Sequence, residues 1–324
     1  MSRRAELLRL LGIAGRSGQR PGDWSGGAGS EGHDEPAAPN QGGQPGPRLE
    51  LLRSETRADY RLDTLLLEVG DDEFAPIDLA LPLQGDGPFP LVIVNHSHGG
   101  DYERGRREMS ASGSYLQQPS YAEALTGMGY AACCMDMRLF GDRGGRTESE
   151  LFKELLWRGQ VLWGLMVGDT LRLVDAMAAR EDIDASRIGT LGMSMGGLMA
   201  WWLAALDTRI RVVVDICGQV EAETLIMKRG LDHHGLYSYV PGLLQSFATL
   251  DIQRLIAPRP RMSLNGRSDR LCPLEGVRLL DAGLREAYAE AGAADNWQSI
   301  VGGGGHRETA EMRARWQRFL REHL

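Results

Sequence analysis

The chain has 324 residues, of which 42% are hydrophobic and 25% are charged, as in ordinary folded globular proteins. Its formal net charge of −8 argues against general nucleic-acid binding, because that binding needs a basic excess to displace counterions. The sequence has no run of the roughly 20 apolar residues that cross a bilayer. Its four cysteines lack the paired spacing of a disulfide framework. We therefore expect a cytoplasmic protein with neither a nucleic-acid nor a membrane partner.

The N-terminal part of the chain differs in composition from the rest. Leucines at helical spacing predict a short helix within residues 1–13. Residues 14–48 are rich in glycine and proline and almost without large apolar side chains, so we predict a disordered linker there. Residues 49–324 form one predicted domain.

Strand and helix patterns alternate along this domain. The first two predicted strands, at 60–69 and 76–83, alternate apolar with polar residues and are expected to pair antiparallel. The later elements, in chain order, are strands at 89–94 and 130–135 around a helix at 121–128, a long helix at 150–180, a strand at 187–191, a helix at 198–206, strands at 210–216 and 261–264, a helix at 274–291, a strand near 297–301 and a helix at 308–323. This alternation predicts an α/β fold with a doubly wound, mostly parallel sheet and helices on both faces.

A candidate nucleophile follows the predicted strand at 187–191. Residues 192–196 read Gly-Met-Ser-Met-Gly, and a predicted helix comes next. A bare match to this pattern can be an incidental glycine-rich turn. The strand before it and the helix after it are the context of a nucleophile elbow, in which a sharp turn projects the serine above the sheet. We therefore predict Ser194 as the catalytic nucleophile.

Serine needs a base, and the base needs an orienting carboxylate. In this fold the order along the chain is serine, acid, histidine, each after a later strand. His306 follows the strand near 297–301 and four glycines, and the other six histidines fit this place less well. Asp269 follows the strand at 261–264 and is the predicted acid. Asp215, in the strand after the elbow, remains a competing acid.

The tetrahedral intermediate of acyl transfer needs hydrogen-bond donors for its oxyanion. One donor is expected to be the backbone N–H of Met195, the residue after the nucleophile. The other is expected from the loop after the strand at 89–94, with the N–H of His98 as first choice and that of Gly99 as second.

The histidine pair His96 and His98 also allows a metal site, completed by Asp101 or by the adjacent histidines 233 and 234. This hypothesis is the weaker one, since a serine triad explains the chemistry without an ion. The glycine-rich segments lack the phosphate-binding patterns of nucleotide sites. We therefore predict no metal and no cofactor.

Several segments together carry a family resemblance. They are residues 96–100 (His-Ser-His-Gly-Gly), residues 136–141 (Asp-Met-Arg-Leu-Phe-Gly), the elbow at 192–196, Asn265-Gly266 with Asp269, and Gly304-Gly305-His306. On these residues the chain resembles the α/β-hydrolase superfamily, and within it the dienelactone hydrolase-like and acetyl xylan esterase-like branch. It departs from the branch at Ser97 and Leu139, where glycine is usual, and the serine at 194 disfavours dienelactone hydrolase activity itself, which uses cysteine.

The resemblance implies a serine hydrolase that cleaves small-molecule carboxylic esters without a cofactor, either a carboxylesterase or a carbohydrate acyl (acetyl) esterase. A peptidase or amidase would use the same triad, and a non-catalytic binding protein is a further alternative. Residues 217–250 look like an insertion that caps the pocket. The sequence allows a homo-oligomer and does not determine the oligomeric state.

Overall fold

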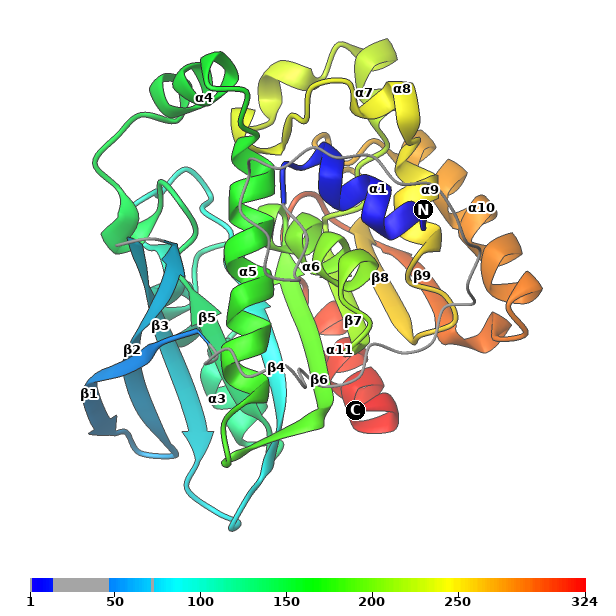
Figure 1. Ribbon diagram of the computed structural model, residues 1–324. Coiled ribbons are helices and arrows are strands. Elements are labelled where there is room, and N and C mark those ends of the chain that lie inside the picture. Colours follow the sequence, from blue (N-terminus) through cyan, green and yellow to red (C-terminus); the bar gives the residue numbers. More distant parts are fainter. Residues whose placement is uncertain (1, 14–46, 71–72) are drawn as a thin grey trace.

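A nine-stranded sheet runs through the described part of the chain, which comprises residues 2–13, 47–70 and 73–324 of the computed structural model (Figure 1). Its strands are β1 (Leu49–Thr56), β2 (Tyr60–Gly70), β3 (Glu73–Pro82), β4 (Phe89–Asn95), β5 (Ala131–Met135), β6 (Ile183–Met193), β7 (Ile210–Ile216), β8 (Arg261–Gly266) and β9 (Trp297–Gly302). The predicted linker at 14–48 lies outside the described residues, apart from its last two.

The strand order is β1-β2-β3-β5-β4-β6-β7-β8-β9. Strands β1, β2 and β3 pair antiparallel, and β3 is antiparallel to β5. From β5 to β9 all neighbours are parallel. The predicted antiparallel pair and the mostly parallel sheet are therefore confirmed. The edge strand β1 was not predicted, because most of its side chains are exposed and leave no apolar alternation to detect.

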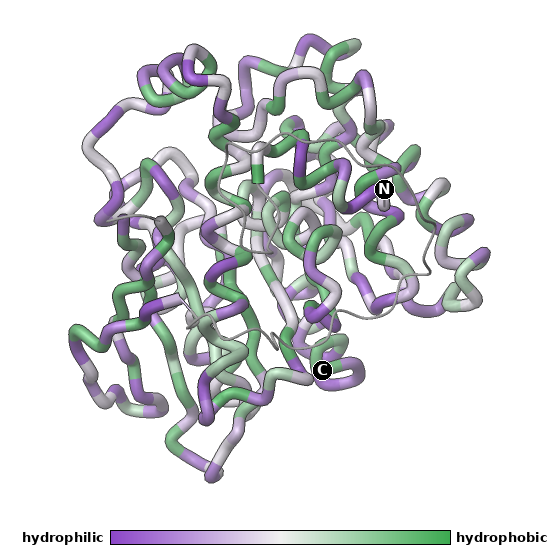
Figure 2. Tube along the Cα trace, in the orientation of Figure 1, coloured by the Kyte–Doolittle hydropathy of each residue, from purple (hydrophilic) through white to green (hydrophobic). Residues whose placement is uncertain are grey.

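Helices cover both faces of this sheet. They are α1 (Arg3–Leu10), α2 (Glu108–Ala111), α3 (Tyr121–Thr126), α4 (Glu148–Trp157), α5 (Leu162–Ala178), α6 (Met195–Leu206), α7 (Ala222–Lys228), α8 (Leu243–Ser246), α9 (Thr249–Arg254), α10 (Leu274–Glu290) and α11 (Ala310–His323). Helices α1, α5 and α6 share one hydrophobic core with the sheet, and α3 and α11 share a second core on the opposite face. Figure 2 shows hydrophobic residues concentrated along the central strands, as expected for strands covered on both faces. Among the described residues, no helix is both long and apolar enough to span a bilayer.

The predicted long helix at 150–180 is wrong, because the chain forms two helices there. Helix α4 ends at Trp157, Gly159 takes φ +68°, and α5 begins at Leu162. A glycine at positive φ is a common helix terminator, since other residues meet a steric penalty there. Only Leu155 of α4 is buried, whereas α5 is buried along most of its length. Apolar residues at helical spacing lie on both sides of Gly159, and Gly164 and Gly168 also interrupt the segment, so the sequence did not mark Gly159 as the break.

Helix α1 packs onto the main body of the protein. Leu7 is fully buried, and the Arg4 guanidinium donates hydrogen bonds to the backbone oxygens of Ala205 (3.0 Å) and Leu255 (2.6 Å). A Cβ atom on Gly164 of α5 would lie 1.8 Å from the Leu11 backbone oxygen, so the two segments are in close contact. The N-terminal helix is thus part of the hydrophobic core.

The segment predicted as a capping insertion, 217–250, follows β7. It contains α7, single 3₁₀ turns at 231–233 and 236–238, and α8. Part of it lines the pocket that contains Ser194, so these residues lie beside the candidate site.

Candidate active site

Ser194 occupies a sharp turn between β6 and α6. Its backbone has φ +56° and ψ −119°, a strained combination for a residue with a side chain. The turn is possible because glycines flank it. A Cβ on Gly192 would lie 2.2 Å from the Gly196 oxygen, and one on Gly196 would lie 1.9 Å from the Asn95 oxygen. The close approach of three backbone segments explains why glycine occupies both places.

The elbow glycine at 196 is expected to tolerate no methyl group. We predict that Gly196→Ala lowers the free energy of unfolding by about 3 kcal/mol, because the Asn95 backbone must move to admit the new Cβ. Urea denaturation measures this loss. The matched control is Gly168→Ala in α5, where the nearest atom would be 3.8 Å away. That variant should gain up to about 1 kcal/mol from its better helix propensity. Equal stability of the two variants would contradict the packing argument.

Three predicted residues lie in one hydrogen-bonded chain. The Ser194 Oγ is 2.7 Å from the His306 Nε2, and the His306 Nδ1 is 2.8 Å from the Asp269 Oδ2. A carboxylate accepts only, so Nδ1 carries the proton and Nε2 presents its lone pair to the serine hydroxyl. The other Asp269 oxygen accepts hydrogen bonds from the backbone N–H groups of Leu271 (2.8 Å) and Cys272 (3.3 Å). Both carboxylate oxygens are thereby held in place.

The competing acid, Asp215, is engaged elsewhere. Its carboxylate lies 2.9 Å from the Arg261 guanidinium and accepts a 2.7 Å hydrogen bond from the Ser263 hydroxyl. The Asp215 and Arg261 side chains are both fully buried. The geometry therefore pairs His306 with Asp269, and Asp215 serves to neutralise a buried arginine.

The loop that carries His306 is anchored by a residue that sequence reasoning missed. Glu308 is 1% exposed. Its carboxylate accepts hydrogen bonds from Arg313 (2.8 Å), the Trp316 indole (2.7 Å) and the Gln117 backbone (3.0 Å). Glutamate is almost never fully buried unless it is paired, and the partners of Glu308 include residues distant in the chain, so its local sequence did not indicate a buried anchor two residues from the candidate base.

The two predicted oxyanion donors line the pocket that contains Ser194 and His306. Within the described residues, neither the Met195 nor the His98 backbone N–H has a hydrogen-bond acceptor. By contrast, the neighbouring Ser97 N–H donates to the buried Glu108 carboxylate at 2.8 Å. Gly99 takes φ +55°, and a Cβ there would lie 2.2 Å from the Tyr115 ring. The Gly99 N–H likewise has no acceptor within the described residues, so this loop offers two unused backbone donors in the pocket wall, at His98 and Gly99.

His96 and His98, the pair that suggested the alternative metal site, already have hydrogen-bond partners. The His96 Nδ1 lies 2.8 Å from the Ser97 oxygen, and its Nε2 accepts the Met137 N–H at 3.1 Å. The His98 Nδ1 accepts the Gly100 N–H at 3.0 Å. Among the described residues, the group with metal-ligand spacing is instead Cys217, Asp269 and His306, which overlaps the hydrogen-bonded chain. The structure does not assemble the metal set suggested by the His-x-His pair.

Burial favours the neutral form of three histidines in or beside this site, His96, His98 and His234. It lowers the pKa of His98 to about 4, and it lowers the pKa of His96 and His234 as well. Below pH 6.5 these histidines therefore bind protons in the unfolded chain but remain unprotonated in the folded chain. Their contribution to the free energy of unfolding falls as the pH falls. Burial also raises the pKa of Glu108 to about 6, which acts in the opposite direction.

We predict that His98 alone accounts for a loss of about 2 kcal/mol in unfolding free energy between pH 7 and pH 5. Urea denaturation of wild type and His98→Asn at both pH values measures it, because the Glu108 contribution is common to the two proteins. The wild type should lose about 2 kcal/mol more than the variant. Equal losses would show that His98 titrates normally.

The pocket in front of Ser194 has a volume of about 440 Å³. Glu148 at the start of α4 lies in its wall and accepts hydrogen bonds from the Tyr237 backbone (2.9 Å) and the Tyr102 hydroxyl (3.2 Å). Tyr237 belongs to the segment 217–250, so this carboxylate, which the sequence did not single out, ties that segment to the body of the protein.

Comparison with known proteins gives matches at three levels. A family model, the prolyl oligopeptidase family (Peptidase_S9), matches residues 118–228, which include Ser194 but neither Asp269 nor His306. The chain is 48% identical over 276 residues to the Bacillus subtilis protein named "Putative hydrolase YtaP", covering 85% of this chain and 92% of that protein.

Solved structures share the fold at low identity. A glucuronoyl esterase from Solibacter usitatus is 18% identical, with a TM-score of 0.63 over 99% of this chain and 92% of that one. An acetyl xylan esterase from Paenibacillus sp. R4 is 17% identical, with a TM-score of 0.60 over 86% and 89%. The fold expected from the motifs is therefore found in proteins of the branch that the motifs resemble.

Proposed function

Since the chain belongs to the α/β-hydrolase superfamily, in the family of YtaP, we propose that it is a serine hydrolase that cleaves carboxylic esters through an acyl-enzyme intermediate. The observation that carries the proposal is the chain of hydrogen bonds from Ser194 through His306 to Asp269, at 2.7 and 2.8 Å. Its substrate class is a small-molecule carboxylic ester, of the carboxylesterase or carbohydrate acyl ester type.

In the first half-reaction, His306 takes the hydroxyl proton as the Ser194 oxygen attacks the ester carbonyl. The N–H groups of Met195 and His98 receive the negative charge that develops on the carbonyl oxygen. Asp269 stabilises the imidazolium. The carbon–oxygen bond to the alcohol then breaks, and the alcohol leaves with the proton held by His306.

In the second half-reaction, water attacks the acyl group on Ser194 while His306 accepts a proton from that water. The bond from the carbonyl carbon to the serine oxygen breaks, and His306 returns the proton to the serine. The carboxylic acid is released, and the free enzyme is regenerated.

Three measurements on the wild-type protein test the proposal. p-Nitrophenyl acetate should be hydrolysed, and a fluorophosphonate should add once, at Ser194, and abolish that hydrolysis. A chelator should leave the rate unchanged, since the mechanism uses no metal. Absence of phosphonate labelling, or loss of activity on chelation, would contradict the serine mechanism.

A peptidase or amidase is the second candidate. The match to the prolyl oligopeptidase family over residues 118–228 favours it, since this segment contains the elbow. The same groups would attack an amide carbonyl, but His306 must then protonate a poorer leaving group. Parallel assays with p-nitrophenyl acetate and p-nitroacetanilide distinguish the two, because an esterase should cleave only the first at an appreciable rate.

A further inference from the structure

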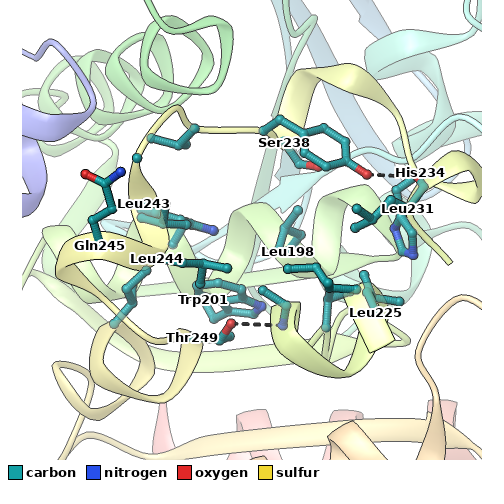
Figure 3. A pocket seen from close by; sticks show the side chains of 18 residues that line it. Leu198, Trp201, Leu225, Leu231, His234, Ser238, Leu243, Leu244, Gln245 and Thr249 are labelled. Carbon is teal, nitrogen blue, oxygen red and sulfur yellow. Dashed lines mark hydrogen bonds between the residues drawn. The ribbon is translucent and has the colours of Figure 1, made fainter. Parts of the chain in front are cut away.

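Figure 3 shows the residues that line a second cavity, which has a volume of about 490 Å³ and shares lining residues with the pocket of Ser194. Leu198, Val220, His234 and Ser238 line both spaces and form the wall between them. Leu198 is four residues after Ser194 on α6, which corresponds to about 6 Å along the helix axis. The second cavity therefore begins about one helical turn from Ser194. A group attached to an ester carbonyl at Ser194 needs only a short chain to reach it.

The second cavity is chemically unlike the first. None of the described residues that line it is Asp, Glu, Lys or Arg, and most are leucine, tryptophan or other apolar residues. The Ser194 pocket, by contrast, has Glu148 and Asp232 in its wall. Apolar lining of this extent favours an alkyl or aryl group over a sugar ring, because a sugar would leave its hydroxyls without partners.

Polar groups at the edge of this cavity are bonded to one another. The Tyr239 hydroxyl donates to the Leu231 oxygen at 2.8 Å, and the Ala222 N–H donates to the Thr249 hydroxyl at 3.2 Å (Figure 3). These bonds join parts of the segment from α7 to α9 across the cavity. They tie parts of its wall together and leave most of its lining surface apolar.

One polar atom on the shared wall has no partner. The Nε2 of His234 is buried and makes no hydrogen bond within the described residues. A buried polar atom without a partner costs free energy that a bound ligand or water recovers. The lining of the second cavity is thus mostly apolar, and this unpartnered atom lies where the cavity meets the serine pocket. Such a cavity suits the apolar tail of an ester whose polar carbonyl group lies in the serine pocket.

We propose that this cavity is a binding subsite for an alkyl or aryl group of the ester whose carbonyl reacts at Ser194. The inference rests on the proposed ester hydrolysis and narrows its substrate class to esters larger and more apolar than acetates of small alcohols. The apolar group can belong either to the acyl part or to the alcohol part of the ester. The experiment therefore has one arm for each part.

The first arm measures kcat/KM for p-nitrophenyl esters from acetate to octanoate, and the second measures it for alkyl acetates from methyl to octyl. In one arm, kcat/KM should rise about fourfold per methylene until the cavity is filled. The filling variant Leu231→Trp should lower kcat/KM for the octyl or octanoyl ester at least tenfold and leave p-nitrophenyl acetate within twofold. Leu236→Trp is the matched control, since Leu236 lies on the same segment and lines neither space.

A flat series in both arms, or equal effects of the two tryptophan variants, would overturn the subsite. Failure of the proposed function has a different signature, because then no ester is cleaved in either arm. In that case, calorimetric titration with 2-octanone decides the subsite independently of catalysis. Saturable binding to the wild type and to Leu236→Trp, lost in Leu231→Trp, supports the subsite, and absence of binding to the wild type overturns it.

Discussion

Replacing Ser194 with alanine is expected to lower kcat for p-nitrophenyl acetate about a millionfold. The Ser194 Oγ is the atom that forms the acyl-enzyme, and loss of a triad nucleophile has effects of about this size in serine hydrolases. Alanine adds no atoms at the elbow, so the flanking glycines and the backbone contacts of the turn are retained. Stopped-time assays at high enzyme concentration measure the residual rate.

The controls for this variant are its stability and its labelling. Its urea midpoint should stay close to that of the wild type, because the side chain is small and the Ser194 N–H still donates to the Ile216 oxygen. Fluorophosphonate labelling should disappear. A residual kcat within a hundredfold of wild type, in protein free of wild-type contamination, would mean that another group is the nucleophile.

Replacing Asp269 with asparagine is expected to lower kcat about ten-thousandfold, the size of effect found for this change in triad enzymes. An amide N–H facing the His306 Nδ1 would favour the tautomer with its proton on Nε2. That nitrogen would then donate to the serine oxygen and be unable to accept its proton. The pH profile of kcat/KM for p-nitrophenyl acetate is the measurement, since activity should recover in part only at high pH.

Asp215→Asn is the matched comparison, because it makes the same chemical change at the competing acid. It leaves the fully buried Arg261 without its carboxylate partner, and breaking such pairs costs about 3–5 kcal/mol of stability. Activity per folded molecule should change little. If instead Asp215→Asn lost catalysis and Asp269→Asn retained it, the assignment of the acid drawn from the structure would be wrong.

Local patterns in the amino-acid sequence predict much of this molecule. Strands β4, β5 and β7 are short, buried and largely apolar runs. The elbow requires glycine at 192 and 196 because of contacts within a few residues and with the nearest strand. Position relative to a strand end also singled out His306 and Asp269. Such features are readable because periodicity and backbone sterics are local properties.

Other features depend on residues far apart in the chain. Strand β1 was hidden because its side chains are mostly exposed on an edge strand. The helix break at Gly159 was hidden because apolar residues at helical spacing lie on both sides of it, and Gly159 is one of three glycines in that segment. The choice between Asp215 and Asp269 required knowing where Arg261 lies, since a carboxylate beside a buried guanidinium is unavailable to a histidine.

The amino-acid sequence by itself determined the class of fold, the elbow serine, and the acid and the histidine that follow it in chain order. All of these depend on spacing along the chain. Only the tertiary structure decided that Glu308 anchors the histidine loop and that an apolar cavity adjoins the serine pocket. Buried ion pairs and cavities arise where separate segments meet, and no pattern within one segment encodes the distance between them.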